Sequence, residues 1–477
     1  MNSHQKGFFR GLAATDVTGK LPANAFRLIV FPPMATKAAA PPSTSGIAIK
    51  SLIVLILVNI MNFYDRHVGG ALAEPIRREF ALTDAQLGLI ASIFTWLYAV
   101  VGLPMGILAD RMSRKRLLSA GIVVWGTLTG FAAWASSYSM LLVSRLGLAV
   151  GESACAPIAT SWIGDLYPPE KRSRPLALFM LGVPVGGALS FFFSGPIAQA
   201  FGWRRAMIAA AIPALLLVPV VLMLREPARG AAEPRPRTDK ASVFDVLLNP
   251  TFWWIIFSGA LVNFNLYALG TFLPAFMGRI HHLKVGPANI ATGVIYLVGG
   301  LLGGTLGGYW GDRIVRHRPD GRMLIAALAA LIASPAAFIG VRQGWGSLYL
   351  AVVFLTLAYG LLNMYYGLVY ASIQDFVAPA VRGTAMAIYF LAMYALGASF
   401  GPYLTGRLSD FMARRAAAAA GSPVVTESFR ATGLQQAMFS IPVLAFALAL
   451  VLWGGSRSIA KRAERQEIQQ MGNLVIE

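Results

Sequence analysis

Charged side chains and cysteine are both scarce in this chain of 477 residues. Asp, Glu, Lys and Arg together make up 13% of it, about half the usual share of a soluble globular domain. The single cysteine, Cys155, excludes a disulfide framework and any zinc site built from cysteines. No phosphate-binding Gly-Lys-Ser/Thr loop and no Ser-His-Asp, paired-histidine or Cys/His constellation is evident. The sequence therefore favours neither an ATP-driven pump, nor a metal site, nor an enzyme.

What the chain has instead is long hydrophobic sequence. Hydrophobic residues make up 56% of it, and the mean hydropathy is +0.62. A helix needs about 20 mostly apolar residues to cross the hydrocarbon core of a bilayer. The apolar runs therefore predict an all-α membrane protein with twelve transmembrane helices. The expected spans are 47–73, 86–109, 117–135, 140–165, 176–200, 206–224, 251–278, 285–311, 323–341, 345–374, 383–406 and 431–455.

Basic residues exceed acidic ones, and the net charge is +19. A nucleic-acid-binding protein would gather its basic residues on one solvated face, but here they form short clusters between apolar runs, so we expect no nucleic-acid partner. With the N-terminus inside, 27 of the 40 basic residues fall in inner segments, 11 in outer loops, and two within spans. This bias predicts that both termini are cytoplasmic. We expect a multi-pass protein of a bacterial inner membrane.

Three polar segments divide the chain. Residues 1–46 lack the apolar core and cleavage site of a signal peptide, so we expect a disordered tail, with Met34 as an alternative start. Residues 225–250 predict a cytoplasmic linker between two six-helix bundles, 47–224 and 251–455. Residues 456–477 predict a cytoplasmic tail that forms a short basic helix on anionic lipid.

The two bundles carry the same motif after their second spans. Residues 106–114 read GILADRMSR and residues 308–316 read GYWGDRIVR, and both fit G-x-x-x-D-R-x-x-R. Asp165 and Arg172 after the fourth span have the same spacing as Asp375 and Arg382 after the tenth. These matches indicate a duplicated six-helix unit (a 6+6 pseudo-repeat). Such a repeat is typical of transporters in which two bundles move around a site at the membrane midplane.

The run GILADRMSRKRLL resembles the signature loop between helices two and three of the major facilitator superfamily, and the resemblance covers essentially all of residues 47–455. Ser113 stands where that family usually has glycine. The resemblance implies interhelical contacts that close the cytoplasmic side and bias a two-state equilibrium. A plain cluster of positive charge is the alternative. The expected gate residues are Gly106, Asp110, Arg111, Arg114, Lys115, Asp312, Arg313 and Arg316.

Two further runs resemble the spinster-like branch of this superfamily. The first span contains Asn62-Phe63-Tyr64-Asp65-Arg66, and residues 151–187 contain a Gly-Glu pair, a KRSR loop and a Pro-Val-Gly motif. That branch is associated with sphingolipid- or lysolipid-like amphiphiles. Anion–cation symporters of the same superfamily share the Asp-Arg pair in helix one. The resemblance therefore implies secondary transport of one of these two substrate classes.

Apart from charges at the ends of spans, four charged residues lie inside predicted spans: Asp65 and Arg66 in the first, and Arg145 and Glu152 in the fourth. Each costs about 2.5–3.5 kcal/mol to insert unless it is paired or hydrated. Arg145 and Glu152 are two helical turns apart and share a face, and we expect Arg145 to orient its span. An anionic substrate that draws Arg66 away from a carboxylate would change the protonation of that carboxylate. We therefore assign Asp65 and Glu152 to proton coupling; a fixed salt-bridge network is the alternative.

Polar and aromatic residues recur at helical spacing in several spans. Three tyrosines and an asparagine between Tyr359 and Tyr370 share one face of the tenth span. Helix packing is the alternative explanation for this stripe. His67 is either a pH sensor or an ordinary hydrogen-bonding residue. An apolar pocket with few polar groups suits a lipid-like ligand. The expected substrate or counter-ion residues are Arg66, Arg145, Asn62, Tyr64, Asn263, Tyr267, Asn363, Tyr366 and Tyr370.

Together these features predict a proton-coupled secondary transporter that moves a lysolipid- or sphingolipid-like amphiphile by alternating access. A proton-coupled symporter of organic anions, with Arg66 holding a carboxylate, is the alternative within the superfamily. A membrane sensor or scaffold without transport is the alternative from a different class. We expect a monomer whose partners are membrane lipids and an amphipathic or anionic small molecule. We expect no cofactor and no metal, with the proton as coupling ion.

Overall fold

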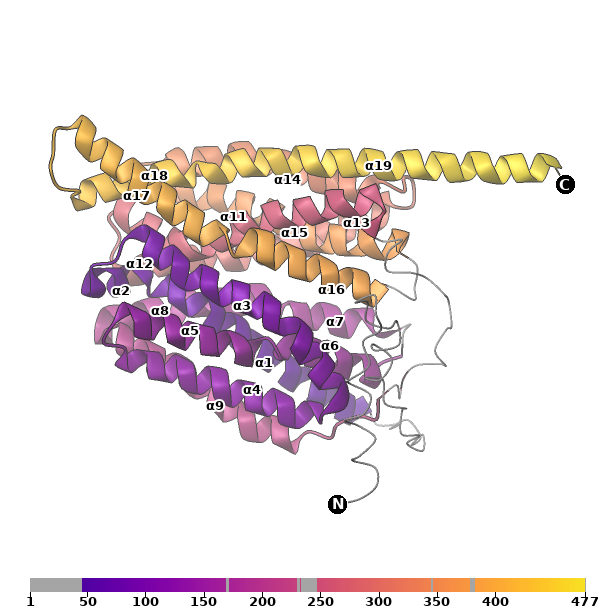
Figure 1. The fold of residues 1–477 in the computed structure, drawn as a ribbon, viewed down its shortest axis with the longest axis horizontal. Helices are drawn as coiled ribbons and strands as arrows, with labels where there is room; N and C mark the ends of the chain where they lie inside the picture. Colours follow the sequence, from indigo (N-terminus) through magenta and orange to yellow (C-terminus); the bar gives the residue numbers. More distant parts are fainter. Residues whose placement is uncertain are drawn as a thin grey trace, which may run out of the picture. The chain divides into compact units, whose positions relative to one another are not determined.

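The computed structural model describes residues 45–168, 171–229, 232, 247–344, 346–377 and 382–476. Within these residues the chain forms α-helices with short 3₁₀ and π segments and no β-strand (Figure 1). Twelve helical segments are long and apolar enough to cross a membrane, which confirms the predicted all-α fold with twelve spans. The predicted N-terminal tail and most of the predicted linker lie outside the described residues.

The first half of the chain forms six spans and one short helix between the first two. Polar side chains begin several of these helices: Thr83 and Gln86 form a capping box, and Ser113 and Ser137 each accept a backbone N–H. The helices of this half are α1 (Ser45–Ala71), α2 (Ala73–Phe80), α3 (Asp84–Arg111), α4 (Arg114–Phe131), η2 (Ala132–Trp134), α5 (Tyr138–Glu152), α6 (Cys155–Leu166), α7 (Ser173–Met180), α8 (Gly182–Phe201) and α9 (Trp203–Met223).

The second half repeats this arrangement after Asn249, which caps its first helix. Two of its spans contain π-helical turns, η4 and η6, where the backbone bonds from i to i+5. The segments of this half are α11 (Pro250–Ile280), α12 (Val285–Val294), η4 (Ile295–Gly299), α13 (Gly300–Ile314), α14 (Gly321–Arg342), α15 (Leu348–Phe376), α16 (Arg382–Ala392), η6 (Met393–Ala398), α17 (Gly401–Ala419), α18 (Glu427–Met438) and α19 (Ser440–Ile476).

The last helix differs from the prediction of a separate surface helix after residue 456. Instead, α19 continues without a break to Ile476 and extends beyond its neighbours (Figure 1). The physical reason lies in the sequence after Ser456, which has no proline and is rich in Ala, Arg, Glu and Gln, all good helix formers. The basic residues Lys461, Arg462 and Arg465 are exposed on this extension.

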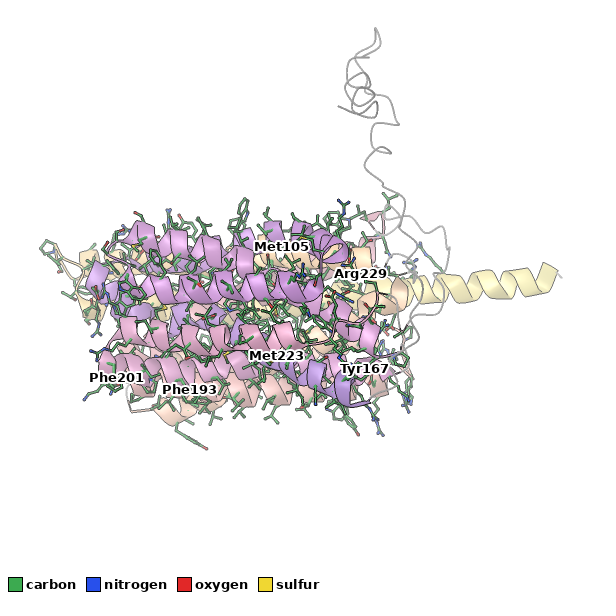
Figure 2. The ribbon with its side chains drawn as sticks, turned by 90° about the horizontal axis from the view of Figure 1, so that it is seen from below. Met105, Tyr167, Phe193, Phe201, Met223 and Arg229 are labelled. Carbon is green, nitrogen blue, oxygen red and sulfur yellow. The ribbon has the colours of Figure 1, made fainter. Side chains whose placement is uncertain are left out.

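Large apolar side chains cover the outside of the helical bundle. Phe193, Phe201 and Met223 are 55%, 60% and 82% exposed, and Figure 2 shows them on the outer surface. A soluble protein rarely exposes so many large apolar residues in continuous bands. This surface is the one that a protein surrounded by lipid requires.

The two ends of the bundle differ in how the halves pack together. We call them the linker end, where α9 ends and α11 begins, and the α2 end, where α2 joins α1 to α3. One buried cluster contains residues from both halves, including Val68 and Leu72 beside Phe272 and Phe276 towards the α2 end. A second cluster around Trp125 belongs to the first half alone. Within the part of the chain that the structure describes, the hydrophobic core is therefore continuous between the halves only at the α2 end.

Glycines allow this close packing at the α2 end. A Cβ atom on Gly70 of α1 would lie 2.2 Å from the carbonyl oxygen of Gly270 in α11. A Cβ atom on Gly88 of α3 would lie 2.2 Å from the carbonyl oxygen of Pro402 in α17. No larger residue fits at either position without moving the backbones apart, as is common where membrane helices cross closely.

An ion-pair network joins the halves at the same end. The Arg279 guanidinium of α11 donates to both carboxylate oxygens of Asp84 at 2.8 Å and to Glu74 at 2.9 and 3.1 Å. Ser409 of α17 donates to Asp84 at 2.6 Å. Arg279, Asp84 and Glu74 are all buried, so water screens these contacts little.

Two further contacts extend the network. The Asp410 carboxylate of α17 accepts from the backbone N–H groups of Asp84 and Ala85 at 3.0 and 2.9 Å, and so caps α3 from the opposite half. Arg77 of α2 donates to Glu427 at the start of α18 at 2.7 Å. We refer to Glu74, Arg77, Asp84, Arg279, Asp410 and Glu427 as the α2-end network.

The α2-end network predicts a specific loss of stability in acid. Burial opposes the charged form of Glu74, but Arg279 and Arg77 outweigh it and lower its pKa from 4.5 to about 2. A depressed pKa contributes stability that is complete above about pH 4.5 and is lost as the pH falls towards 2. We expect Glu74→Gln to melt at a lower temperature at pH 7 and to lose less stability than the wild type between pH 5 and pH 3. Melting curves of both proteins at these pH values test this, and equal acid sensitivity would contradict it.

Candidate functional site

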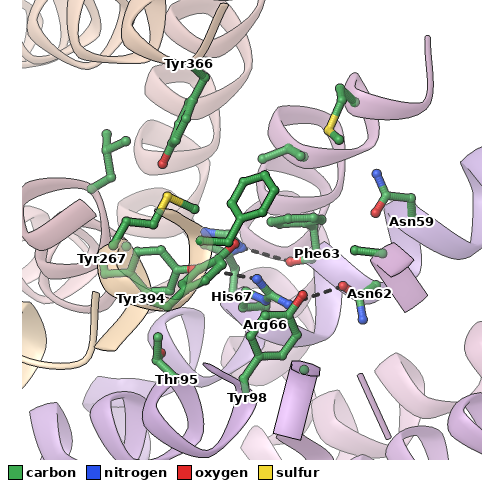
Figure 3. A pocket seen from close by; sticks show the side chains of 18 of the residues that line it. Asn59, Asn62, Phe63, Arg66, His67, Thr95, Tyr98, Tyr267, Tyr366 and Tyr394 are labelled. Atoms are coloured by element: carbon green, nitrogen blue, oxygen red, sulfur yellow. Dashed lines mark hydrogen bonds between the residues drawn. The ribbon is translucent and has the colours of Figure 1, made fainter. Parts of the chain in front are cut away.

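A cavity of about 1490 Å³ lies between the two halves (Figure 3). Its lining residues towards the α2 end, such as Ile76, Leu87 and Met207, are buried. Towards the linker end, lining residues such as Leu103 and Ile107 of α3 are exposed. The cavity is therefore closed at the α2 end, where the halves pack tightly, and open towards the linker end.

The two walls of the cavity differ in charge. Among the described residues, every charged side chain that lines it belongs to the first half: Arg66, Asp110, Arg145 and Arg174. The wall from the second half is made of tyrosines, glycines, small polar residues and apolar residues. At mid-depth the cavity surface therefore carries two guanidinium groups and no carboxylate.

Arg66 has the largest set of contacts among these residues. Its guanidinium donates to Asn62 of α1 at 3.4 Å and to the Tyr267 hydroxyl of α11 at 3.2 Å (Figure 3). It also donates to Glu152 of α5 at 3.3 Å. Its charged end also lies over the ring of Tyr98, 4.3 Å from the centroid. Arg66 thus contacts both halves at once and is held by a carboxylate, an amide, a hydroxyl and an aromatic ring.

The two carboxyl groups lie behind this arginine, away from the cavity surface. Glu152 is fully buried, and only its Oε2 has a hydrogen-bond partner among the described residues. Asp65 is 1% exposed, and neither of its carboxyl oxygens has a partner among them. Arg145 donates to the backbone carbonyl of Asp65 at 3.4 Å. The structure thus brings the four predicted charged residues close together. Among these four, Arg66 and Glu152 form the single carboxylate–guanidinium pair.

The tyrosines of the tenth span form much of the opposite wall. Tyr366, Tyr370 and Asn363 line the cavity, and Tyr366 and Tyr370 pack edge to face with their ring centroids 5.5 Å apart. Asn263 does not line it but accepts from the Tyr366 hydroxyl at 2.9 Å. Tyr64 does not line it either: its hydroxyl shares a hydrogen bond of 2.9 Å with Ser194 and joins α1 to α8.

The two π-helical turns each place one tyrosine beside the first half. Tyr296 in η4 packs against His67 with ring centroids 5.2 Å apart, and Tyr394 in η6 packs against Tyr98 at 5.3 Å. π-Helical turns are found frequently at functional sites because they change the direction of the side chains that follow. The sequence does not predict either tyrosine as a site residue, because neither belongs to a recognisable motif or to a stripe of polar and aromatic residues at helical spacing.

The predicted gate in the first half forms a compact set of contacts at the linker end. Arg114 is fully buried and pairs with Asp165 at 2.5 Å and Glu226 at 3.3 Å. Glu226 also caps the start of α4 by accepting from Ser113 and from the Arg114 backbone, and these bonds outweigh the effect of burial and lower its pKa. Lys115 donates to the Leu224 carbonyl at 3.4 Å.

Arg229 completes this set of contacts from the first residues of the linker. Its guanidinium donates to three carbonyl groups at the end of α3, those of Ala109, Asp110 and Met112. Figure 2 shows Arg229 beyond Met105 of α3, towards the linker end. A cation at the last turn of a helix is stabilised by the unpaired carbonyls there. Gly106 lines the cavity one helical turn before Asp110. The side chains of Asp110 and Arg111 are exposed.

In the second half a different residue occupies the position of Arg114. Arg322 at the start of α14 pairs with Asp375 and with Asp312, the latter at 3.3 Å. The motif predicts Arg316 for this role, but Arg316 and Arg313 are exposed. The turn from Val315 to Asp320 separates α13 from α14, so the arginine that reaches the carboxylates comes six residues later.

This difference between the halves gives a direct prediction. Arg322→Ala removes the cation that Asp312 and Asp375 share, so we expect a clear loss of transport, several-fold or more. Arg316→Ala removes an exposed charge and should leave transport within about twofold of wild type. Initial rates of both variants at equal surface expression test this. If Arg316→Ala is the more damaging change, the assignment of Arg322 is wrong.

Comparison with known proteins agrees with this geometry. The sequence profile of the Major Facilitator Superfamily matches residues 54–402. An MFS-type efflux pump of Mycolicibacterium smegmatis is 30% identical over 360 residues, which cover 75% of this chain and 83% of the pump. Protein spinster homolog 1 of Homo sapiens is 29% identical over 434 residues, which cover 84% of this chain and 79% of that protein.

A solved structure shows the same arrangement of helices. It is a bacterial homolog of the human lysosomal transporter Spinster, in an inward-facing and unoccupied conformation. The two match with a TM-score of 0.79 and 27% sequence identity over 88% of this chain and 99% of that one. These findings confirm the resemblance predicted from the signature loop and the Asp65–Arg66 pair. The chain is a multi-pass membrane transporter that belongs to the Major Facilitator Superfamily, with spinster-like relatives.

Proposed function

We propose that the protein is a proton-coupled secondary transporter that moves an anionic, lysolipid- or sphingolipid-like amphiphile by alternating access. The observation that carries this proposal is the contrast inside the cavity. The charged groups on its surface at mid-depth are the Arg66 and Arg145 guanidiniums, while most of the remaining lining is aromatic, aliphatic or glycine. Such a cavity suits a molecule with one anionic group and a long apolar part.

Arg66 supports a mechanism for coupling. An anion that binds Arg66 competes with Glu152, which is its carboxylate partner in this structure. A buried carboxylate that loses its counter-charge is stabilised by taking up a proton. Asp65 lies beside Arg66 on the same helix, and its carboxyl oxygens have no hydrogen-bond partner among the described residues. We therefore assign substrate binding to Arg66 and proton exchange to Glu152 and Asp65.

The closed α2 end and the open linker end support one step of the transport cycle. The tight helix crossings and the α2-end network hold the halves together on one side while the cavity is open on the other. The distribution of lysine and arginine supports a cytoplasmic linker end in a bacterial cell. We therefore propose that this conformation is an inward-facing state of a monomeric transporter in the inner membrane. Transport requires breaking the α2-end network and closing the cavity at the linker end.

Reconstituted flux tests the proposal and its alternative. The purified full-length protein is placed in liposomes with an imposed pH gradient, and the flux of 1-oleoyl-lysophosphatidylglycerol is compared with that of lactate and succinate. We expect gradient-dependent flux of the lysolipid and none of the small acids. Flux of lactate or succinate alone would favour the organic-anion symporter, because Arg66 can hold any carboxylate. An absence of flux for all three would contradict this function and favour a sensor or scaffold.

A further inference from the structure

His67 lies beside Arg66 on the cavity wall but is absent from the mechanism above. Its Nδ1 donates to the Phe63 carbonyl one turn earlier, at 2.8 Å (Figure 3). A carbonyl only accepts hydrogen bonds, so this contact places the ring proton of the neutral imidazole on Nδ1. Nε2 then carries a free lone pair and acts as an acceptor.

Packing holds the His67 ring in one orientation. Phe191 of α8 and Tyr296 of η4 both meet it edge to face, with ring centroids 5.8 and 5.2 Å away. Because these two rings come from different halves, His67 lies at the boundary between them. Its Nε2 therefore has a fixed direction, as a group that discriminates between ligands requires.

A glycine packs closely against both His67 and Tyr296. A Cβ atom on Gly270 of α11 would lie 3.6 Å from His67 Nε2 and 2.8 Å from the Tyr296 hydroxyl. Gly270, His67 and Tyr296 all line the cavity. The Tyr296 hydroxyl contacts the Leu266 carbonyl at a long distance of 3.4 Å and also interacts with the side chain of Tyr359. The acceptor Nε2 and the Tyr296 hydroxyl thus lie close together beside Gly270, one from each half.

From this juxtaposition we propose that His67 Nε2 and the Tyr296 hydroxyl bind a hydroxyl group of the substrate, next to the anionic group held by Arg66. The substrate hydroxyl donates to Nε2 and accepts from Tyr296. The site then prefers amphiphiles that carry a hydroxyl close to their anion over those that lack it. This inference rests on the proposed function, since it places the hydroxyl relative to an anion at Arg66.

A pair of probes that differ by one hydroxyl tests the inference. They are 1-oleoyl-lysophosphatidate and its 2-deoxy analogue, which share the acyl chain and the phosphate. Initial rates at low concentration in proteoliposomes give the ratio of kcat/KM values. We expect the wild type to prefer the hydroxylated probe by about five- to tenfold, the effect of one net hydrogen bond. In His67→Phe, and separately in Tyr296→Phe, we expect the ratio to fall towards one.

A matched histidine serves as control. His317 also contacts the carbonyl four residues earlier through Nδ1, at 3.3 Å, but it is exposed and does not line the cavity. His317→Phe should therefore keep the wild-type ratio. The inference is wrong if the wild type transports both probes equally, or if His67→Phe and Tyr296→Phe both retain the preference. If the wild type transports neither probe, nor lysophosphatidylglycerol, the proposed function itself fails and the inference fails with it.

Discussion

Arg66→Lys is expected to reduce lysolipid transport by about 10- to 100-fold. The guanidinium bonds at once to Glu152, Asn62 and Tyr267, and its flat face lies over the Tyr98 ring. A lysine ammonium is a point charge that cannot make this fork of contacts. Loss of one charge-assisted hydrogen bond, which contributes about 1.5–3 kcal/mol, accounts for the expected range.

A second arginine provides a matched control for Arg66→Lys. Arg407 of α17 also donates to a tyrosine hydroxyl, that of Tyr403 at 3.2 Å, and lies over the same ring, but it is exposed. Arg407→Lys should therefore transport at close to the wild-type rate. Rates are measured in proteoliposomes with equal amounts of inserted protein. Normal transport by Arg66→Lys would remove Arg66 from the substrate site.

Asp65→Asn and Glu152→Gln are expected to uncouple transport from the pH gradient. With one proton exchanged per substrate, a gradient of one pH unit corresponds to about 1.4 kcal/mol and supports about a tenfold substrate gradient. A variant that cannot exchange the proton should reach a substrate gradient of about one, while still exchanging labelled for unlabelled substrate. Both carboxyl groups are buried beside Arg66 and Arg145. We therefore do not expect an acid on the protein surface to take over proton exchange from either of them.

The steady-state substrate gradient, measured with and without a pH gradient, distinguishes uncoupling from simple loss of activity. Glu464→Gln, which changes an exposed acid on α19, is the control and should couple normally. Full pH-driven accumulation by both Asp65→Asn and Glu152→Gln would show that the buried charges form only a structural network.

Much of the fold follows from local sequence. Apolar length predicts the twelve spans, which the structure confirms. The contact between Arg66 and Glu152 is also accessible from sequence, because a charge inside a span is costly and needs a partner. The change in polarity at Ser456 predicts the end of a helix, but α19 continues because helix propensity continues through this position.

Contacts between distant parts of the chain could not be predicted in the same way. Arg279 pairs with Glu74 and Asp84, which precede it by 205 and 195 residues, and in the sequence each of these charges resembles an ordinary loop or helix-end charge. Tyr64 illustrates the opposite case, since it lies within the recognised motif but points at Ser194 rather than into the cavity. Three-dimensional placement, not residue type, decides which of these groups can meet a substrate.

The central claim is that an anionic substrate displaces Glu152 from Arg66 and that a proton follows. The most direct measurement is proton uptake by the purified full-length protein in weakly buffered solution near neutral pH, on addition of 1-oleoyl-lysophosphatidylglycerol, whose phosphodiester does not titrate there. We predict uptake of about one proton per bound molecule in the wild type and none in Glu152→Gln. Binding of the lysolipid by the wild type without any proton uptake would contradict the account.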